Sequence, residues 1–434
     1  MQIIAQYRGL PRQIYFLFMA RMINAMGMFV YPYITLFLTT RLGYDDAEVG
    51  MYLFWVSVCY VPAALAGGKL ADMFKRKGLY IGSLLLADVA FVIAGFNCDS
   101  INVVWYMLAG FFFLNVGMPV LSAMMMDLTM PSNRQESYSL IYLGANLGVA
   151  FGPLIAGFLF VNYTEWIFFG QAIFSVLALL LIGFGVADTT PGKQQIEAIA
   201  RDASRAAEAA SSRSLLGVMI RTPIVPLFAT LAAAYAFSYA QISYIMPLQM
   251  EDAFGLDFGA QSYGVIWSLN GLFVFIGTPI LVFLSKKYGP LFNMFLAGSL
   301  YALGFYFYSM ADSLLIVYYV LVAVWSAGEV IAATNTGVFI ANHAPVSHRA
   351  RFQSICEIIN GSGRAIGPVV IGEYLIGHTI PQTWRLIGVL CIMAALCYLL
   401  LHRYLLSHGG GRETQPVNSA KSIAEQEARA AGGR

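Results

Sequence analysis

The chain has 434 residues, of which 59% are hydrophobic and only 11% are charged, against about 25% charged residues in a typical soluble domain. This composition excludes a water-soluble protein, and a net charge of +2 is too small to indicate a nucleic-acid partner. The five cysteines lie within or at the ends of apolar segments without disulfide or metal-ligand spacing, so we interpret them as buried thiols.

Apolar runs of roughly 18 to 28 residues follow one another along the chain, and each is long enough to cross ~30 Å of hydrocarbon. The first run, from Ile14 to Leu38, is too long for the core of a cleaved signal peptide, so we keep it as a membrane span. We predict an all-α membrane protein with twelve transmembrane helices at 12–39, 48–72, 79–97, 102–127, 135–160, 164–187, 222–250, 260–285, 290–310, 313–342, 350–377 and 382–406.

One apolar segment occurs twice, as GVAFGPLIAG from Gly148 to Gly157 and as GRAIGPVVIG from Gly363 to Gly372. Glycines spaced by four let a neighbouring helix approach closely, and proline bends the backbone. The repeat therefore predicts two pseudosymmetric six-helix bundles. The helix-packing residues that we expect in the two copies are Gly148, Gly152, Pro153, Gly157, Gly363, Gly367 and Pro368.

The positions of the basic residues predict the orientation in the membrane. Of the 25 lysine and arginine residues, 21 fall on the side of the N-terminus, and the opposite loops are acidic. The positive-inside rule therefore places both termini in the cytoplasm. A polar, alanine-rich stretch separates six spans from six. The predicted domains are an N-terminal bundle at 1–187, a cytoplasmic linker at 188–221, a C-terminal bundle at 222–406 and a cytoplasmic tail at 407–434.

The loop GGKLADMFKRKG, from Gly67 to Gly78, resembles the signature loop of the major facilitator superfamily, which joins a glycine, an acidic residue and a basic cluster in a short connection. The resemblance covers essentially the whole chain and implies the major facilitator fold, with a midplane cavity open alternately to each side. It also implies a cytoplasmic conformational latch made of Gly68, Asp72, Lys75, Arg76, Asp127 and Arg134. A plain positively charged cytoplasmic loop is the alternative.

Two further segments resemble the drug/proton antiporters of this superfamily. GVAFGPLIAG is similar to their fifth-helix motif, with Ala156 in place of one glycine, and SAGEV is similar to their tenth helix, where a glutamate after glycine is implicated in proton coupling. Many relatives also carry an arginine on helix four, and some a carboxylate on helix five. Here Phe113 and Ile141 stand at those positions, so the first-half coupling site of those relatives is absent.

Ionisable residues at membrane depth indicate function, because each costs at least ~2.5 kcal/mol to insert. Glu329 and Arg364 each lie about 20 Å from the cytoplasmic end of a predicted helix, so the two can meet near the midplane. Our hypothesis is that Glu329 takes up and releases the proton, with Arg364 and Glu357 in the same proton-coupling group. The alternative is a static buried ion pair. For Arg21 and Asp88 we favour a structural pair within the first bundle.

The predicted substrate cavity lies between helices one, four, seven and ten. Aromatic and methionine side chains on these helices can repack around varied apolar cations, although aromatic residues also face lipid and the membrane interface. The cavity residues that we select are Arg21, Met26, Tyr31, Asn115, Tyr235, Tyr239, Gln241, Trp325 and Asn335.

No GxxxxGK[ST] motif, catalytic triad or metal-ligand spacing occurs, so we expect neither an enzyme nor a cofactor. We predict a monomeric secondary active transporter of the cell membrane that exports amphipathic drugs or similar small molecules in exchange for protons. The nearest alternative is a proton-coupled transporter of a single metabolite, in either direction. A membrane sensor would predict an additional ligand or output domain, which we do not find in the sequence.

Overall fold

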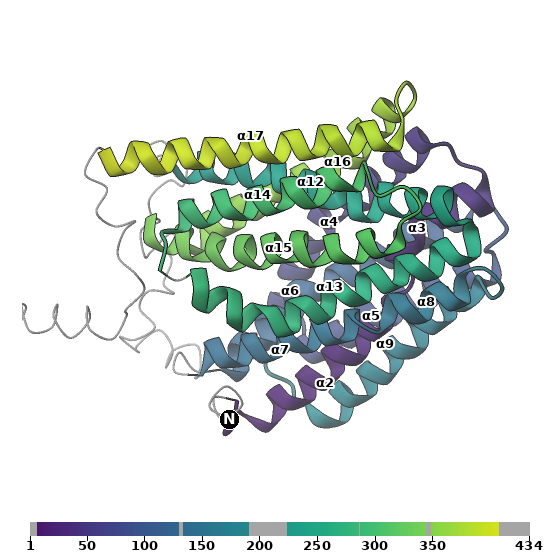
Figure 1. Cartoon of the computed structure of the whole chain (residues 1–434). Helices are drawn as coiled ribbons and strands as arrows, with labels where there is room; N and C mark the ends of the chain where they lie inside the picture. Colours follow the sequence, from purple (N-terminus) through teal and green to yellow (C-terminus); the bar gives the residue numbers. More distant parts are fainter. Residues whose placement is uncertain (1–6, 130–132, 191–223, 286, 344–348, 408–434) are drawn as a thin grey trace, which may run out of the picture.

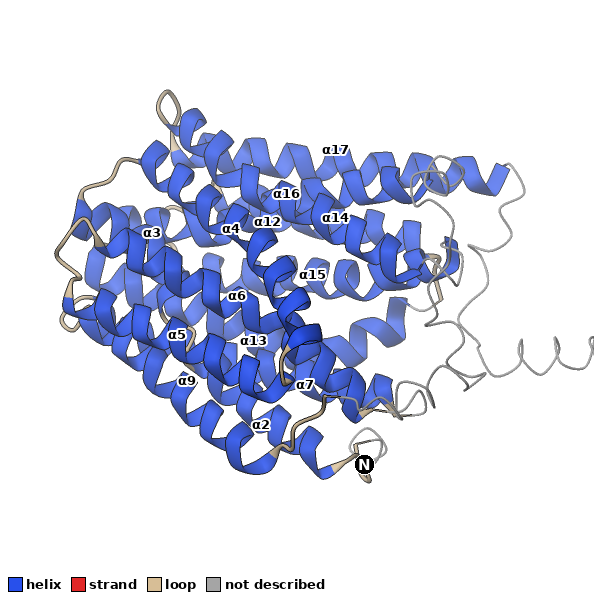
Figure 2. Cartoon of the chain, turned by 180° about the vertical axis from the view of Figure 1, so that it is seen from behind, coloured by secondary structure: helices blue, strands red, loops and turns tan. Residues whose placement is uncertain are grey.

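The structure is a computed structural model that describes residues 7–129, 133–190, 224–285, 287–343 and 349–407. Within these ranges every regular element is a helix (Figure 2). Most of the predicted linker and tail, and the side chains of Asp72 and Arg134, lie outside the described residues. The helices are α2 (Arg12–Met26), α3 (Val30–Leu42), α4 (Asp46–Met73), α5 (Arg76–Phe96), α6 (Val103–Leu128), α7 (Arg134–Val149), α8 (Gly152–Phe160), α9 (Glu165–Gly185), α12 (Ile224–Phe254), α13 (Leu256–Ser285), α14 (Pro290–Tyr308), α15 (Leu315–His343), α16 (Arg349–Leu375) and α17 (Ile380–Ser407).

Eleven helical stretches of the described chain are long and apolar enough to cross a membrane. Two of them each combine a pair of helices, because α2 and α3 form one stretch and α7 and α8 form another. Helix α16 is not among the eleven. It has 27 residues, and Arg349, Arg351, Glu357, Arg364 and Glu373 make it the most highly charged of the long helices in the second part of the chain.

Two predicted spans are broken near their middles. Helix α2 ends at Met26, and α3 starts at Val30. The C-cap of α2, Gly27, lies so close to Phe174 of α9 that an added Cβ would be 2.5 Å from the Phe174 side chain. Helix α7 ends at Val149 with Ala150 as its C-cap, and α8 starts at Gly152 with Pro153 in its first turn. Proline lacks the N–H that would continue the hydrogen-bond ladder, which explains the second break.

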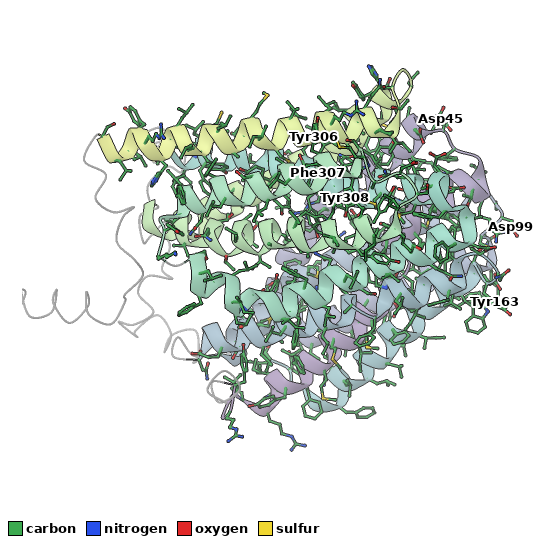
Figure 3. The ribbon with its side chains drawn as sticks, viewed as in Figure 1. Asp45, Asp99, Tyr163, Tyr306, Phe307 and Tyr308 are labelled. Atoms are coloured by element: carbon green, nitrogen blue, oxygen red, sulfur yellow. The ribbon has the colours of Figure 1, made fainter. Side chains whose placement is uncertain are left out.

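The turns between helices gather at two opposite ends of the molecule (Figure 1). One end, named here the Asp45 end, carries Asp45, Asp99 and Tyr163, which Figure 3 labels. Helix α4 begins there with a capping box, in which Asp45 accepts from the Glu48 N–H at 2.8 Å and Glu48 accepts from the Asp45 N–H at 3.0 Å. The opposite end, named the Arg76 end, holds the starts of α2 and α5.

The glycines of the repeated segment allow close contacts between helix backbones. An added Cβ at Gly148 would collide with the Met22 carbonyl of α2, and one at Gly152 would lie 2.7 Å from the Met26 carbonyl. The second copy has matching contacts with α12, where Gly363 adjoins the Ala233 carbonyl and Gly367 adjoins the Phe237 carbonyl. The first and seventh predicted spans therefore each pack directly against the repeated glycines of their own half.

We name residues 12–185 the first half and residues 224–407 the second half. Helices of the two halves pack together where α4 meets α16, where α13 meets α7 and α8, and where α12 meets α3. Among the described residues, three hydrogen bonds from side chains to backbone carbonyls join the halves, all in the part nearer the Asp45 end. They run from Tyr33 to the Ala260 carbonyl (2.8 Å), from Thr35 to the Ser243 carbonyl (2.8 Å) and from Tyr244 to the Asp46 carbonyl.

Candidate functional site

Glu329 occupies the central position of the 29-residue helix α15, about 21 Å from either end. Its side chain is half-buried. The hydroxyl of Tyr239, on α12, donates to Oε1 of Glu329 at 3.2 Å, and the amide of Asn270, on α13, donates to Oε2 at 2.7 Å. Three helices therefore hold this carboxyl group, and each of its oxygens has a neutral donor.

Asn270 is not among the site residues predicted from the sequence. It is only 3% exposed, and its amide also donates to the Ser326 hydroxyl at 2.9 Å. A buried amide in an apolar helix needs hydrogen-bond partners. The lone asparagine in the predicted span 260–285 was therefore the available signal, but its partners lie on other helices and cannot be identified from spacing.

Helix α13 also contacts the break between α7 and α8. Gly271 follows Asn270, and an added Cβ there would lie 2.9 Å from both the Asn146 carbonyl and the Ala150 nitrogen. The charge of Glu329 also reaches Tyr142, on α7. The carboxyl group is thus connected through Asn270 to the point in the first half where α7 ends.

Arg364 does not form the expected ion pair with Glu329. The only ion pair in the described part of the chain joins Arg76 and Asp127. Arg364 is exposed and near enough for its charge to act on Glu329 and Tyr239. The two residues lie at similar depth, but Glu329 is turned toward Tyr239 and Asn270, which corrects the prediction of direct contact.

The expected pair of Arg21 and Asp88 is also absent from the described residues. Asp88 is 5% exposed, and its Oδ2 accepts a hydrogen bond from Ser175 at 3.0 Å, while its Oδ1 has no partner. Both charges act on Tyr80, which lies on the same helix as Asp88. The two residues therefore share a neighbourhood in the first half without forming a salt bridge.

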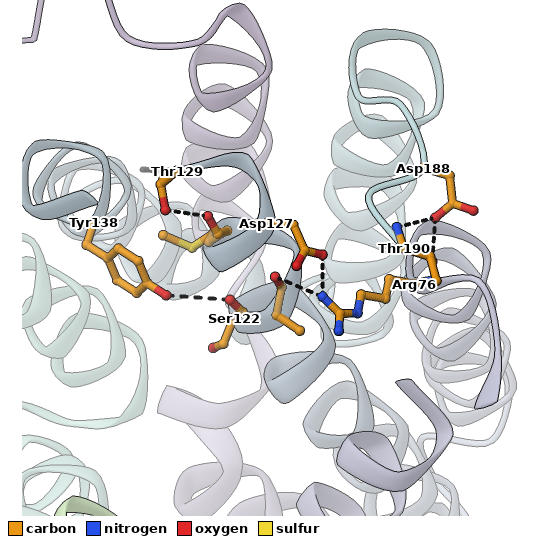
Figure 4. A network of polar contacts seen from close by, with 9 residues as sticks. Arg76, Ser122, Asp127, Thr129, Tyr138, Asp188 and Thr190 are labelled. Carbon is orange, nitrogen blue, oxygen red and sulfur yellow. Dashed lines mark hydrogen bonds and ion pairs between the residues drawn. The ribbon is translucent and has the colours of Figure 1, made fainter. Parts of the chain in front are cut away.

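At the Arg76 end, the Arg76 guanidinium donates to Asp127 and joins the start of α5 to the end of α6 (Figure 4). The Arg76 N–H donates to the Thr190 hydroxyl at 2.9 Å, and that hydroxyl donates to Asp188 at 2.9 Å. Lys77 donates to the Gly183 carbonyl of α9 at 2.6 Å. These contacts tie three segments of the first half together beside the loop that resembles the superfamily signature.

The contacts in this network shift the pKa of Asp188. Its slight burial tends to raise its pKa, but hydrogen bonds from Thr190 and from the Lys77 backbone, together with the charge of Lys75, have the greater effect and leave the pKa below its ordinary value. Asp188 is exposed. It therefore stays ionised at neutral pH as a weak support of the turn after α9.

Within the signature-like loop, the tight helix contact is made by Gly67. An added Cβ at Gly67 would collide with the Val116 carbonyl of α6 and would lie 2.9 Å from Pro119. At Gly68, which the sequence analysis selected, an added Cβ would meet nothing within 4 Å. The close contact with α6 is therefore made by the residue before Gly68, and the latch role of Gly68 stays a prediction.

Four of the predicted cavity residues are buried inside the second half. The hydroxyl of Tyr235 donates to the Met294 carbonyl at 2.9 Å, and the indole of Trp325 donates to the Tyr308 hydroxyl at 2.9 Å. Gln241 is 0% exposed, and Asn335 accepts from Asn293 at 2.8 Å. In this conformation these four side chains pack inside the second half, and their role in lining a substrate cavity stays a prediction.

The other predicted cavity residues, Arg21, Met26, Tyr31, Asn115 and Tyr239, are half-buried. The ring of Tyr31 packs edge to face on Phe111 with centroids 6.0 Å apart, and the Asn115 amide donates to the Phe111 carbonyl at 2.9 Å. Tyr239 is the member in direct contact with Glu329. The substrate-binding role of these five residues stays a prediction.

Comparison with known proteins agrees with this architecture. Residues 17–368 match the family model of the Major Facilitator Superfamily. The peptide transporter POT in complex with alafosfalin superimposes with a TM-score of 0.70 at 18% identity, over 92% of this chain and 96% of that chain. The POT family transporter PepTSo superimposes with a TM-score of 0.71 at 16% identity, over 92% of this chain and 99% of that chain.

Among curated proteins, a Na(+), Li(+), K(+)/H(+) antiporter of Planococcus maritimus is 23% identical over 88% of this chain and 93% of its own length. Multidrug resistance protein MdtH of Proteus mirabilis is 27% identical over 46% of this chain and 52% of its own length. The family model spans most of the 434 residues, and the helical architecture is that of solved members. The chain therefore belongs to the major facilitator superfamily and is a membrane transporter.

Proposed function

We propose that this protein is a proton-coupled antiporter that exports amphipathic small molecules by alternating access. The observation that carries the proposal is the placement of Glu329 at the centre of α15, held by Tyr239 and Asn270 and by no arginine or lysine in the described chain. An ion pair stabilises the charged form of a carboxyl group. Neutral donors leave the carboxyl group able to exchange its proton.

The proposed architecture has twelve spans in two six-helix bundles. Helix α16 is the twelfth span, since it packs between α4 and α12 and is long enough to cross the bilayer. The Arg76 end faces the cytoplasm, because 21 of the 25 basic residues fall on that side. In this arrangement the Arg76–Asp127 pair belongs to the cytoplasmic latch, and the halves are joined at the exterior side by the three hydrogen bonds near the Asp45 end.

The test is substrate flux driven by a proton gradient in vesicles containing the purified protein. Glu329→Gln keeps the shape of the side chain and resembles its protonated form but cannot ionise, so we expect gradient-driven flux to fall by at least about a hundredfold, the effect of losing an essential proton carrier. Glu373→Gln, an exposed position near the Asp45 end of α16, is the control. Flux of Glu329→Gln at the wild-type rate would show that Glu329 is structural.

A second candidate is exchange of monovalent metal cations for protons. It is favoured by the Planococcus maritimus relative, whose name states that activity and which matches nearly the whole chain. The same vesicles discriminate the two candidates. Proton movement triggered by Na⁺, Li⁺ or K⁺ without any organic substrate supports cation exchange, whereas proton movement that requires an amphipathic compound supports the first proposal. Flux confined to one metabolite would instead support the single-substrate alternative.

A further inference from the structure

Arg364 is a charge at mid-helix that forms no ion pair with any residue of the described chain. It lies fifteen residues after the start of α16 and eleven before its end, hence about 22 Å and about 17 Å from the two ends. A charge at such depth is costly to insert, and retained charges of this kind face a bundle interior or a water-filled space. The exposed guanidinium therefore needs a ligand for its charge.

The neighbours of Arg364 on α16 show which way that side of the helix faces. Gly363 and Gly367 contact the backbone of α12, and Pro368 contacts Gly50 of α4, in the first half. Residues four apart lie on the same side of a helix. Arg364 is four residues before Pro368, so it lies one helical turn from the contact with α4, on the side of α16 that faces the first half. The Arg364 side chain itself is exposed.

The electrostatic surroundings agree with this placement. The charge of Arg364 reaches Tyr31 in the first half and Tyr239, Tyr301 and Glu329 in the second. Glu329 is held back from Arg364 by Tyr239 and Asn270. A cationic group and a carboxyl group thus stand near one another, between the halves, without neutralising each other.

We propose that Arg364 is an anion-binding subsite, and that the transported compound is an amphipathic zwitterion whose carboxylate binds Arg364 while its cationic group competes with the proton for Glu329. This inference rests on the transport function proposed above. Guanidinium groups bind carboxylates through two parallel hydrogen bonds, which gives both strength and orientation. The carboxylate stays on Arg364 as Glu329 exchanges a proton for the cationic group, so one proton moves against one zwitterion of zero net charge.

The experiment is equilibrium binding of two matched dyes to the purified full-length protein, followed by fluorescence polarisation. Rhodamine 110 has a free carboxylate and is a zwitterion, while rhodamine 123 is its methyl ester and differs only in the added methyl group, which removes that negative charge. We expect wild type to bind the free acid about tenfold tighter than the ester, the effect of a charge-assisted hydrogen-bonded pair. Arg364→Gln should remove this preference by weakening the free acid alone, and Arg364→Lys should restore part of it.

Arg385→Gln, an exposed arginine near the Asp45 end of α17, is the matched control and should keep the preference. The proposal is overturned if wild type does not prefer the free acid, if neither dye binds, or if Arg364→Gln weakens both dyes equally. Thermal unfolding of each variant identifies a general loss of structure. Because binding at equilibrium needs no proton gradient, these outcomes are separate from the Glu329→Gln flux result, which tests the proposed function.

Discussion

Tyr33 in the first half and Tyr244 in the second half make corresponding contacts. The Tyr33 hydroxyl adjoins Gly157, the last glycine of the first repeat, and bonds to the Ala260 carbonyl at the start of α13. The Tyr244 hydroxyl adjoins Gly372, the last glycine of the second repeat, and bonds to the Asp46 carbonyl at the start of α4. In each half, the tyrosine hydroxyl thus lies beside a glycine of its own half and bonds to a backbone carbonyl of the opposite half.

The polar site is not duplicated in this way. The repeat offset of 215 residues places Leu114, Trp55 and Val149 opposite Glu329, Asn270 and Arg364. A carboxyl group, an amide and a guanidinium in the second half therefore correspond to apolar residues in the first half. The comparison teaches that the close glycine contacts follow the repeat, whereas the polar site around Glu329 has no counterpart at the corresponding positions of the first half.

The largest expected effect tests whether the repeated glycines make equivalent contacts in the two halves. Gly148→Ala and Gly363→Ala place a Cβ against a neighbouring backbone carbonyl, and overpacking of this kind costs about 1–3 kcal/mol. We expect similar drops in thermal unfolding temperature for the two variants. Gly361→Ala, where an added Cβ meets nothing within 4 Å, is the control and should be neutral or stabilising. Clearly unequal losses for Gly148 and Gly363 would break the equivalence of the two halves.

The next effect tests whether the polar site around Glu329 belongs to the second half alone. Asn270→Ala removes one of the two donors that position Glu329, and we expect proton-driven flux to fall about tenfold, in line with the worth of one hydrogen bond to a charged group. The dependence of flux on pH should also shift, which a merely structural change would not cause. Trp55→Ala, at the corresponding exposed position of the first half, should leave that dependence unchanged.

A smaller effect is expected at the tyrosines. Tyr33→Phe and Tyr244→Phe each delete a hydrogen bond between the halves, worth about 1 kcal/mol. Each should shift the population toward states open at the Asp45 end by about fivefold, measured by distances between spin labels at that end. Tyr52→Phe deletes a bond to the Val104 carbonyl within the first half and should cause no such shift. No change for either variant would contradict a role in closure.

The smallest effect is expected at the latch. The ion pair of Arg76 and Asp127 is partly open to solvent, and such pairs contribute about 0–1 kcal/mol that salt screens. Asp127→Asn should therefore lower the unfolding temperature slightly at low ionic strength and less at high ionic strength. The measurement is a pair of thermal scans at two salt concentrations. A large loss that salt does not reduce would assign this pair a buried, structural role.

The sequence predicted the all-helical membrane architecture and the family, because long apolar runs and a repeated glycine segment are local signals. It placed Glu329 and Arg364 at similar depth, since rise per residue fixes depth along a helix. It did not predict that they stay apart, because contact depends on which side of each helix faces the other. The role of Asn270 and the break at Gly27 depend on partners from distant helices, Glu329 in one case and Phe174 in the other.

Gly271 gives the site a mechanical consequence. Its backbone touches the backbone of Ala150, where the helical ladder of the first half is interrupted, and the residue before it holds the Glu329 carboxyl group. In the proposed mechanism, a change of charge at Glu329 that moves Asn270 acts one residue away from the break between α7 and α8. The residue that bonds to the proposed proton site and the residue that touches the break between α7 and α8 are therefore neighbours in the chain.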